Sequence, residues 1–190
     1  MKAIVAVDKK WGIGKRNGLL FELPADMKFF RETTSGKVVV MGSNTLKSFP
    51  GGKPLKNRIN VVLYPEGEKR DDCIVVGSMD ELKAELKKYA EEDVFVIGGA
   101  MFYKTMLPYC SEVLVTKVDA DGGAEVFYEN LDEKPEYSYD FNAESVVPEK
   151  AFFKGYKREK GNAGIRNEIY IIPTVGCVNN VCRIIEKRAQ

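Results

Sequence analysis

Short apolar runs rich in Val and Ile recur along the chain and predict a buried sheet. Each run is continuous rather than alternating, which is typical of strands that are covered on both faces. Helical patterns separate several of the runs, so crossover connections and a mainly parallel sheet are expected. The expected strands are Ala3–Val7, Lys37–Met41, Ile59–Leu63, Cys73–Val76, Val94–Ile97 and Val113–Val118.

Three helices are expected between these strands. Pro24–Thr34 begins with proline at the first helical position, where proline is favoured. Ser78–Glu81 is a capping box followed by apolar residues at helical spacing. Ala100–Met106 is the third expected helix, and Pro108 follows its end. The alternation of strands and helices therefore predicts the α/β class.

The pattern changes after Gly122 and Gly123. Ala151–Arg158 and Asn167–Ile172 are predicted to be strands of an antiparallel hairpin at the sheet edge, with a glycine-rich turn between them. No internal repeat or linker interrupts the chain. We therefore expect one domain over residues 1–172, followed by an extension of unknown role over residues 173–190.

Composition limits the classes of function. The chain has 190 residues, of which 44% are apolar and 30% are charged, as in one packed domain. Its 29 basic and 28 acidic residues give a net charge near +1, so no bulk attraction to nucleic acid or acidic lipid is expected. The sequence has no long apolar run and no secretory signal pattern at its start, so a cytoplasmic location is expected.

The chain contains no histidine, which excludes Ser-His and Cys-His nucleophiles and zinc sites that use histidine. Its four cysteines are Cys73, Cys110, Cys177 and Cys182, and none belongs to a C-x-x-C pair. We therefore expect no metal. Cys73 and Cys110 lie in apolar stretches and are expected to be buried, reduced thiols.

Two strands lead through glycine directly into a helix. Gly42 follows one strand, and Gly98-Gly99 follows another. A helix start of this kind presents free backbone N–H groups and the positive end of the helix dipole to phosphate. Glycine also ends many strands without any ligand, but two such ends in one small parallel sheet suggest a ligand with more than one phosphate. Neither the G-x-G-x-x-G fingerprint nor a P-loop is present.

Asp26 is the candidate for acid–base chemistry. It lies in the first turn of the Pro24–Thr34 helix, and Phe29 and Phe30 follow on the same face. One interpretation is that Asp26 only complements the helix dipole. The other is a carboxylate at the mouth of an aromatic-lined pocket, suited to proton delivery or to a flat amidine-like ring. The glycine-rich segment Trp11–Gly18 before it is either a closing loop or an ordinary surface loop.

These residues resemble those of the dihydrofolate reductase family from about residue 1 to residue 172. Four segments carry the resemblance in the order and spacing of the family: IVAVDKKWGIGKRNGLLFELPADMKFF, VVVMGSNTLKSFPGGKPLKNRINVVL, VFVIGGAMFYKTMLP and VLVTKVDAD. The resemblance implies an eight-stranded, mainly parallel sheet with helices on both faces. It also implies hydride transfer from NADPH to the pterin ring of dihydrofolate, with a small-molecule substrate and a monomeric protein.

On this resemblance Asp26 would hydrogen-bond the 2-amino group and N3 of the pterin and favour protonation at N5. Thr116 would support Asp26, and Arg58 would pair with the α-carboxylate of the substrate. Leu19 and Phe21 would belong to the closing loop and lie with Asp26 at the reacting ring. The implied substrate-binding residues are Ile4, Ala6, Asp26, Phe30, Lys53, Arg58 and Thr116.

The resemblance also implies a set of cofactor-binding residues and a cis peptide between Gly98 and Gly99. The implied residues are Ala6, Ile13, Gly14, Gly42, Ser43, Asn44, Thr45, Tyr64, Gly98, Gly99, Ala100, Met101, Phe102 and Tyr103.

The chain departs from the family pattern at several of these positions. Phe21 stands where the family usually has Trp, and Leu20 where it usually has Pro. Basic residues that usually hold the cofactor phosphates are replaced, with Ser43 and Asn44 among the replacements. NADPH is therefore the expected cofactor, with NADH as the alternative.

Two other functions are weighed against this one. The first is a related reductase of another pterin or of a ribityl-pyrimidine, which Arg58 disfavours because a glutamate tail needs a forked cation. The second is a non-catalytic module that binds a nucleotide or pterin. The presence of Asp26, Thr116 and Arg58 together disfavours that module.

Overall fold

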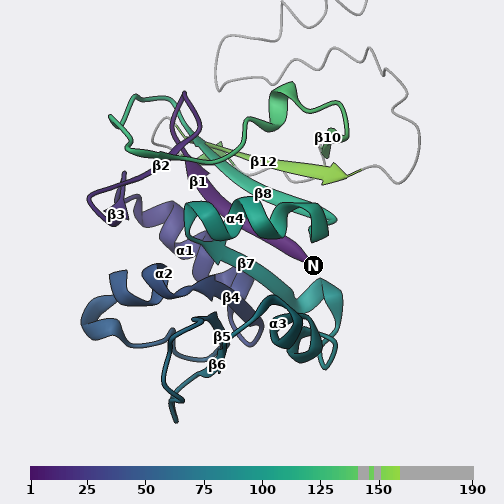
Figure 1. Ribbon diagram of the computed structural model, residues 1–190. Helices are drawn as coiled ribbons and strands as arrows, with labels where there is room; N and C mark the ends of the chain where they lie inside the picture. The colour runs from purple at the N-terminus through teal and green to yellow at the C-terminus, as the bar shows by residue number, and fades with distance from the viewer. Residues whose placement is uncertain (141–145, 148–150, 159–190) are drawn as a thin grey trace, which may run out of the picture.

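The computed structural model describes residues 1–140, 146–147 and 151–158 (Figure 1). Its helices are α1 (Pro24–Thr34), α2 (Ser43–Ser48), α3 (Met79–Leu86) and α4 (Ala100–Met106). Its strands are β1 (Lys2–Val7), β2 (Gly12–Lys15), β3 (Gly18–Leu19), β4 (Val38–Gly42), β5 (Ile59–Leu63), β6 (Ile74–Val76), β7 (Val94–Gly98), β8 (Glu112–Val118), β9 (Val126–Phe127), β10 (Tyr137–Asp140), β11 (Val146–Val147) and β12 (Ala151–Arg158). The six apolar runs and three helical patterns are confirmed: Ile59–Leu63, Pro24–Thr34 and Ala100–Met106 have the expected bounds, and the bounds of the other five strands differ by at most one residue.

The main sheet has the strand order β10-β12-β8-β1-β7-β4-β5-β6, and the short strand β11 also pairs with β12. From β8 to β6, each strand is parallel to the next one in this order. Parallel neighbours place their carboxyl ends at one edge of the sheet, and in open α/β sheets ligands bind at that edge. The α/β class and the mainly parallel eight-strand path are therefore confirmed.

Helices cover both faces of this sheet. Figure 1 shows α4 in front of the sheet and α1 behind it. Along β4 the buried side chains alternate between two core clusters: Val38 and Val40 pack with α3 and α4, whereas Val39 and Met41 pack with Leu46 of α2. A strand that buries side chains on both faces of the sheet has a continuous apolar sequence, which explains the unbroken apolar run along β4.

The expected antiparallel edge is confirmed by the described residues. Strand β12 lies antiparallel between β8 and β10, and β10 is the outermost of the described strands on this side. Strand β10 was not expected, because its sequence YSYD is short and polar. The other expected strand, Asn167–Ile172, lies outside the described residues, as do Cys177, Cys182 and the 173–190 extension.

The glycine-rich segment before α1 forms part of a second, small sheet. Strand β2 pairs antiparallel with β3 and with β9. The turn between β2 and β3 holds Arg16 and Asn17, both with positive φ, which is the backbone of a type I′ hairpin turn. This hairpin carries Leu19 next to the carboxyl edge of the main sheet.

Cys73 and Cys110 are both free thiols, and Cys110 is buried as expected whereas Cys73 is only partly covered. Over the described part of the chain, no helix has the length and apolar character needed to cross a bilayer. The same residues contain no cluster of acidic and thiol groups suited to a metal ion.

Candidate active site

Asp26 lies in the first turn of α1, where Pro24 starts the helix. The Thr116 hydroxyl, on β8, donates a 2.6 Å hydrogen bond to Asp26 Oδ1. Thr116 is 2% exposed and stands beside Ala6 in the parallel register of β1 and β8. The structure therefore brings together Asp26, Thr116 and Ala6, which the sequence placed on three separate segments.

Burial raises the pKa of Asp26 above its usual value, and the hydrogen bond from Thr116 partly offsets this rise in pKa. No cation is paired with this carboxyl group in the described part of the chain. The group is thus set to exchange a proton nearer to neutral pH than an exposed aspartate. The alternative in which Asp26 only complements the helix dipole does not explain its partial burial or its bond to β8.

Tyr103 connects α4 to the same region. Its hydroxyl donates a 2.6 Å hydrogen bond to the carbonyl of Ile4 on β1. Burial raises the pKa of Tyr103 well above its usual range, and the negative charge of Asp26 adds to this rise in pKa. Tyr103 therefore stays a neutral donor near the acid, and its side chain is engaged with β1.

Phe21 and Leu19 occupy different positions relative to this acid. Phe21 is half-buried and packs with Leu23 and Ala25 against Val118. Leu19 on β3 is 69% exposed. Both residues lie on the segment that leads directly into α1, so the position of this segment affects how far solvent reaches Asp26.

A second group of residues lies at the far end of α1. The Arg58 guanidinium stands 5.6 Å from the centre of the Phe30 ring. Its Nε donates to Thr34 Oγ1 at 2.8 Å, and its two terminal nitrogens donate to the carbonyls of Lys56 and Arg31. Burial lowers the pKa of Arg58 and so does the nearby Arg31, although the group stays charged at neutral pH because its usual value is so high.

These contacts fix the orientation of the Arg58 guanidinium beside the Phe30 ring. In the described part of the chain no carboxylate pairs with Arg58. The site is therefore chemically suited to an external carboxylate. Lys53, expected to assist Arg58, is exposed on the segment after the short 3-10 helix Pro50–Gly52.

The two glycine-ended strands lie side by side. Strands β4 and β7 pair in parallel, with Met41 opposite Gly98. A Cβ atom on Gly98 would lie 2.9 Å from Thr45 Oγ1, and one on Gly42 would touch Phe102. The peptide between Gly98 and Gly99 is cis, as the family resemblance implied. Glycine is needed here because each strand end presses against the helix that follows the other strand.

Both helix starts offer backbone donors at this edge. Among the described residues, no side chain caps α2 or α4, so the first N–H groups of each helix are open to a ligand. Ser43, Asn44 and Thr45 form the first turn of α2. Ala100 begins α4, and Met101 beside it is 77% exposed. The convergence of the two ends fits a ligand with more than one phosphate.

Ile13 and Gly14, also expected at the cofactor, lie on β2. Ile13 is half-buried against the main core, and Gly14 is buried. A Cβ on Gly14 would lie 2.9 Å from the carbonyl oxygen of Gly18. Gly14 therefore allows the tight pairing of β2 with β3 that carries Leu19.

Sequence reasoning missed one cation near Tyr64. The Lys47 ammonium lies 4.7 Å from the centre of the Tyr64 ring. Arg70, another cation of this region, pairs with Asp72 and donates to the Gly52 carbonyl. Lys47 escaped notice because it is on a helix, and only the packing of α2 against β5 brings its side chain over Tyr64.

A surface pocket of about 230 Å³ lies along the outer side of α4. Residues of α4 and the Phe127–Glu129 segment line it, and Asp26 does not. This pocket is separate from the acid and from the first turn of α2.

Comparison with known proteins decides the family. The dihydrofolate reductase family model matches residues 1–154. The chain belongs to the dihydrofolate reductase family. It is 35% identical to the dihydrofolate reductase of Bacillus subtilis over 132 residues, which cover 68% of this chain and 76% of that protein. It is 31% identical to the dihydrofolate reductase of Staphylococcus haemolyticus over 138 residues, covering 71% and 81% of the two chains.

A solved dihydrofolate reductase has the same fold. The enzyme from Enterococcus faecalis, complexed with NADP(H) and RAB-propyl, superposes with a TM-score of 0.73 at 30% identity, over 84% of this chain and 96% of that one. A second family model, the second domain of D-galactarate dehydratase/altronate hydrolase, matches residues 155–190. The match to the dihydrofolate reductase family therefore ends at Lys154 inside β12, and the match to the second family model begins at the next residue, Gly155.

Proposed function

We propose that this protein reduces 7,8-dihydrofolate to 5,6,7,8-tetrahydrofolate with NADPH, and so supports one-carbon metabolism. The observation that carries the proposal is the partly buried Asp26, bonded to Thr116 on β8 of the same sheet that holds the pair of glycine-ended strands. Family membership supports the same reaction. The two alternatives, a reductase of another pterin or ribityl-pyrimidine and a non-catalytic binding module, explain Arg58 or Asp26 less well.

Asp26 would bind the pterin through its 2-amino group and N3, which are donors that match a carboxylate. Because burial raises the pKa of Asp26, the carboxyl group retains a proton over a wider pH range and favours protonation of the substrate at N5. Thr116 holds the carboxyl group in place. Ile4 and Ala6 on β1 and Phe30 on α1 would supply apolar walls for the rings. Leu19 and Phe21 would limit the access of water.

The residues at the glycine-ended strands would hold the cofactor. The open N–H groups of α2 and α4 suit its phosphates. Gly98 and Gly99 permit the close approach of a ligand because they have no side chains. When bound, NADPH supplies the hydride. Lys47 beside Tyr64 adds a cation on the α2 side of this site and supports NADPH over NADH.

The direct test is a spectrophotometric assay of the purified protein with dihydrofolate, run in parallel with NADPH and with NADH. We expect oxidation of NADPH that depends on dihydrofolate, and slower oxidation of NADH. Absence of turnover with either cofactor would reject the reductase, and equal rates would reject the preference for NADPH.

Arg58→Leu tests the identity of the substrate. We expect KM for dihydrofolate to rise by about tenfold or more, as is usual when one partner of a hydrogen-bonded charge pair is removed. A dihydropterin without the glutamate tail should be affected much less. Arg31→Leu is the matched control, because it removes a neighbouring exposed cation and leaves the Arg58 guanidinium in place. Equal losses for both substrates would contradict the pairing with a carboxylate.

We also propose that the protein acts as a monomer in the cytoplasm. The near-neutral net charge supports this arrangement. The domain boundary expected at residue 172 stays a prediction. The described fold supports a reductase unit that extends at least to Arg158, because β12 ends there.

A further inference from the structure

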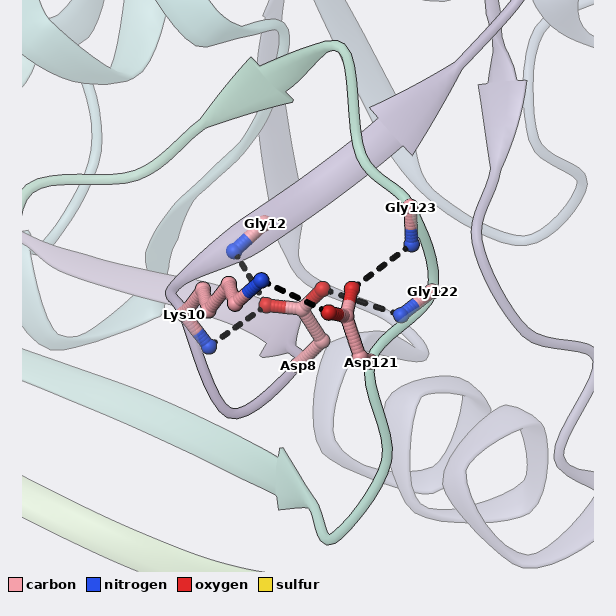
Figure 2. Close-up of polar contacts among 6 residues, drawn as sticks. All are labelled: Asp8, Lys10, Gly12, Asp121, Gly122 and Gly123. Carbon is pink, nitrogen blue, oxygen red and sulfur yellow. Dashed lines mark hydrogen bonds and ion pairs between the residues drawn. The ribbon is translucent and has the colours of Figure 1, made fainter.

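Asp8, at the end of β1, is a buried carboxylate outside the site described above. It is 1% exposed. Its Oδ1 accepts hydrogen bonds from the backbone N–H groups of Lys10 at 2.8 Å and Gly12 at 2.7 Å. Its Oδ2 accepts from the N–H of Gly122 at 3.1 Å (Figure 2). Burying a carboxylate is costly unless hydrogen-bond donors surround it, and these three backbone N–H groups supply the donors to Asp8.

The three donors come from two segments that are far apart in sequence. Lys10 lies in the turn from β1 into β2, Gly12 is the first residue of β2, and Gly122 belongs to the connection from β8 to β9. All three partners are donors, so only a side chain that purely accepts satisfies them. A Cβ on Gly12 would lie 2.9 Å from Asp8 Oδ2 and 2.3 Å from the Ala124 side chain, so the site is built around glycine.

A backbone hydrogen bond from the N–H of Lys9 to the carbonyl of Ala120 also joins the two segments, and the ion pairs between them face solvent. Lys10 pairs with Asp121 at 2.7 Å, as Figure 2 shows, and the two side chains are 68% and 51% exposed. Exposed ion pairs of this kind contribute little because water and salt screen them. Water therefore screens the bond from Gly122 to the buried Asp8 carboxylate less than it screens these ion pairs.

Gly122 in turn supports the segment before α1. A Cβ on Gly122 would lie 3.0 Å from Leu20 Cδ1 and 3.1 Å from Phe21 Cζ, so both side chains rest on the Gly122 backbone. We propose that Asp8 is a positioning residue for reduction of dihydrofolate: by holding Gly122 it sets the surface on which Leu20 and Phe21 pack, and so places the loop over the reacting ring. The inference rests on the proposed function.

Asp8→Asn tests this inference selectively. The amide oxygen still accepts from Lys10 and Gly12, but the amide nitrogen now faces the N–H of Gly122, and two donors cannot bond. We expect the single-turnover rate of hydride transfer per folded molecule to fall about tenfold, while KM for dihydrofolate changes little. Amide hydrogen exchange should speed up at Gly122 and stay unchanged at Gly12.

Lys10→Met is the matched control, because it removes the exposed ion pair with Asp121 and keeps every backbone donor. It should leave the hydride-transfer rate unchanged. An unchanged rate in Asp8→Asn, or an equal fall in Lys10→Met, would overturn the proposal. If Asp8→Asn does not fold, the hydride-transfer rate of Gly122→Ala is the test, since its methyl group presses on Leu20 and Phe21 and leaves Asp8 intact. An unchanged rate in Gly122→Ala would then overturn the proposal.

The wild-type protein in the same assay separates this inference from the function. Lack of turnover in the wild type rejects dihydrofolate reduction. Turnover in the wild type with an unaltered Asp8→Asn rejects only the role of Asp8.

Discussion

Replacing Asp26 with Asn should lower the turnover of dihydrofolate at neutral pH by about a hundredfold or more, the usual contribution of a positioned acid or base. Asn keeps the size of the side chain and still accepts the Thr116 hydrogen bond, but it carries no charge and no exchangeable acid proton. The proposed cofactor site lies at the ends of β4 and β7, so the affinity for NADPH should change little. Steady-state kinetics and a fluorescence titration with NADPH measure the two effects.

Glu32→Gln is the matched control, because Glu32 is an exposed carboxylate on the same helix. It should retain full activity. Turnover of Asp26→Asn equal to that of the wild type would remove Asp26 from the mechanism. Equal loss of NADPH affinity and turnover would instead indicate a damaged fold.

The pH dependence follows from the raised pKa of Asp26. The rate of hydride transfer should be highest where the carboxyl group is protonated and should fall as pH rises through this pKa. The free energy of unfolding should follow the same trend. Because the pKa of Asp26 is raised in the folded state, the group stabilises the fold fully below its unfolded pKa, and this stabilisation is lost as pH rises through the folded pKa. Both trends should be flatter in Asp26→Asn. A wild-type rate that rises with pH would contradict this assignment.

Ending the chain after Lys154 should abolish cooperative folding, whereas ending it after Arg158 should preserve folding and activity. The shorter chain loses half of β12, which pairs with β8 from Ala151 opposite Val118 to Lys157 opposite Glu112. It also loses Tyr156, which is 1% exposed, lies 5.9 Å from the Trp11 ring and donates a 2.7 Å hydrogen bond to Asp132.

The size of the loss in stability decides whether the chain that ends at Lys154 folds. Removing a buried aromatic side chain costs about 3–5 kcal/mol, and each lost backbone hydrogen bond costs about 1 kcal/mol more. The total approaches the whole stability of an ordinary domain, about 5–15 kcal/mol. Circular dichroism and thermal unfolding measure the result. A chain ending at Lys154 that melts cooperatively at the wild-type temperature would contradict the prediction.

Point variants in the full chain make the same test without truncation. Tyr156→Phe keeps the ring and loses the hydrogen bond to the Asp132 carboxylate, so it should cost about 1.5–3 kcal/mol. Tyr156→Ala should cost more, because it also removes the buried ring. The result bears on the sequence match, because Tyr156 lies in the part that matches a different family. The reductase fold would then depend on residues beyond the end of its own family match.

Much of the fold was predictable because its signals are local. Parallel strands covered on both faces need unbroken apolar runs, and Pro24 marks a helix start wherever the helix packs. The strands that escaped prediction carry no such signal. Strand β10 is polar, and the β2–β3 turn uses Arg16 and Asn17 in place of the usual glycine. Tertiary packing stabilises these elements.

The candidate site divides in the same way. The sequence by itself determined which residues are suited to the chemistry: Asp26 in a first helical turn, a forked cation at Arg58, and two strands ending in glycine. Only the tertiary structure decided which of them meet. Thr116 reaches Asp26 across 90 residues, Thr45 lies against Gly98, and Asp8 holds Gly122 across 114 residues.

The physical reason is the range of each interaction. Helix caps, turns and apolar periodicity depend on neighbours within a few residues, so they can be recognised in a linear sequence. Burial, which raises the pKa of Asp26, and the hydrogen bonds of Asp8 depend on strand order and register. Strand order and register are settled only when the whole sheet assembles, which buries Asp8 and partly buries Asp26.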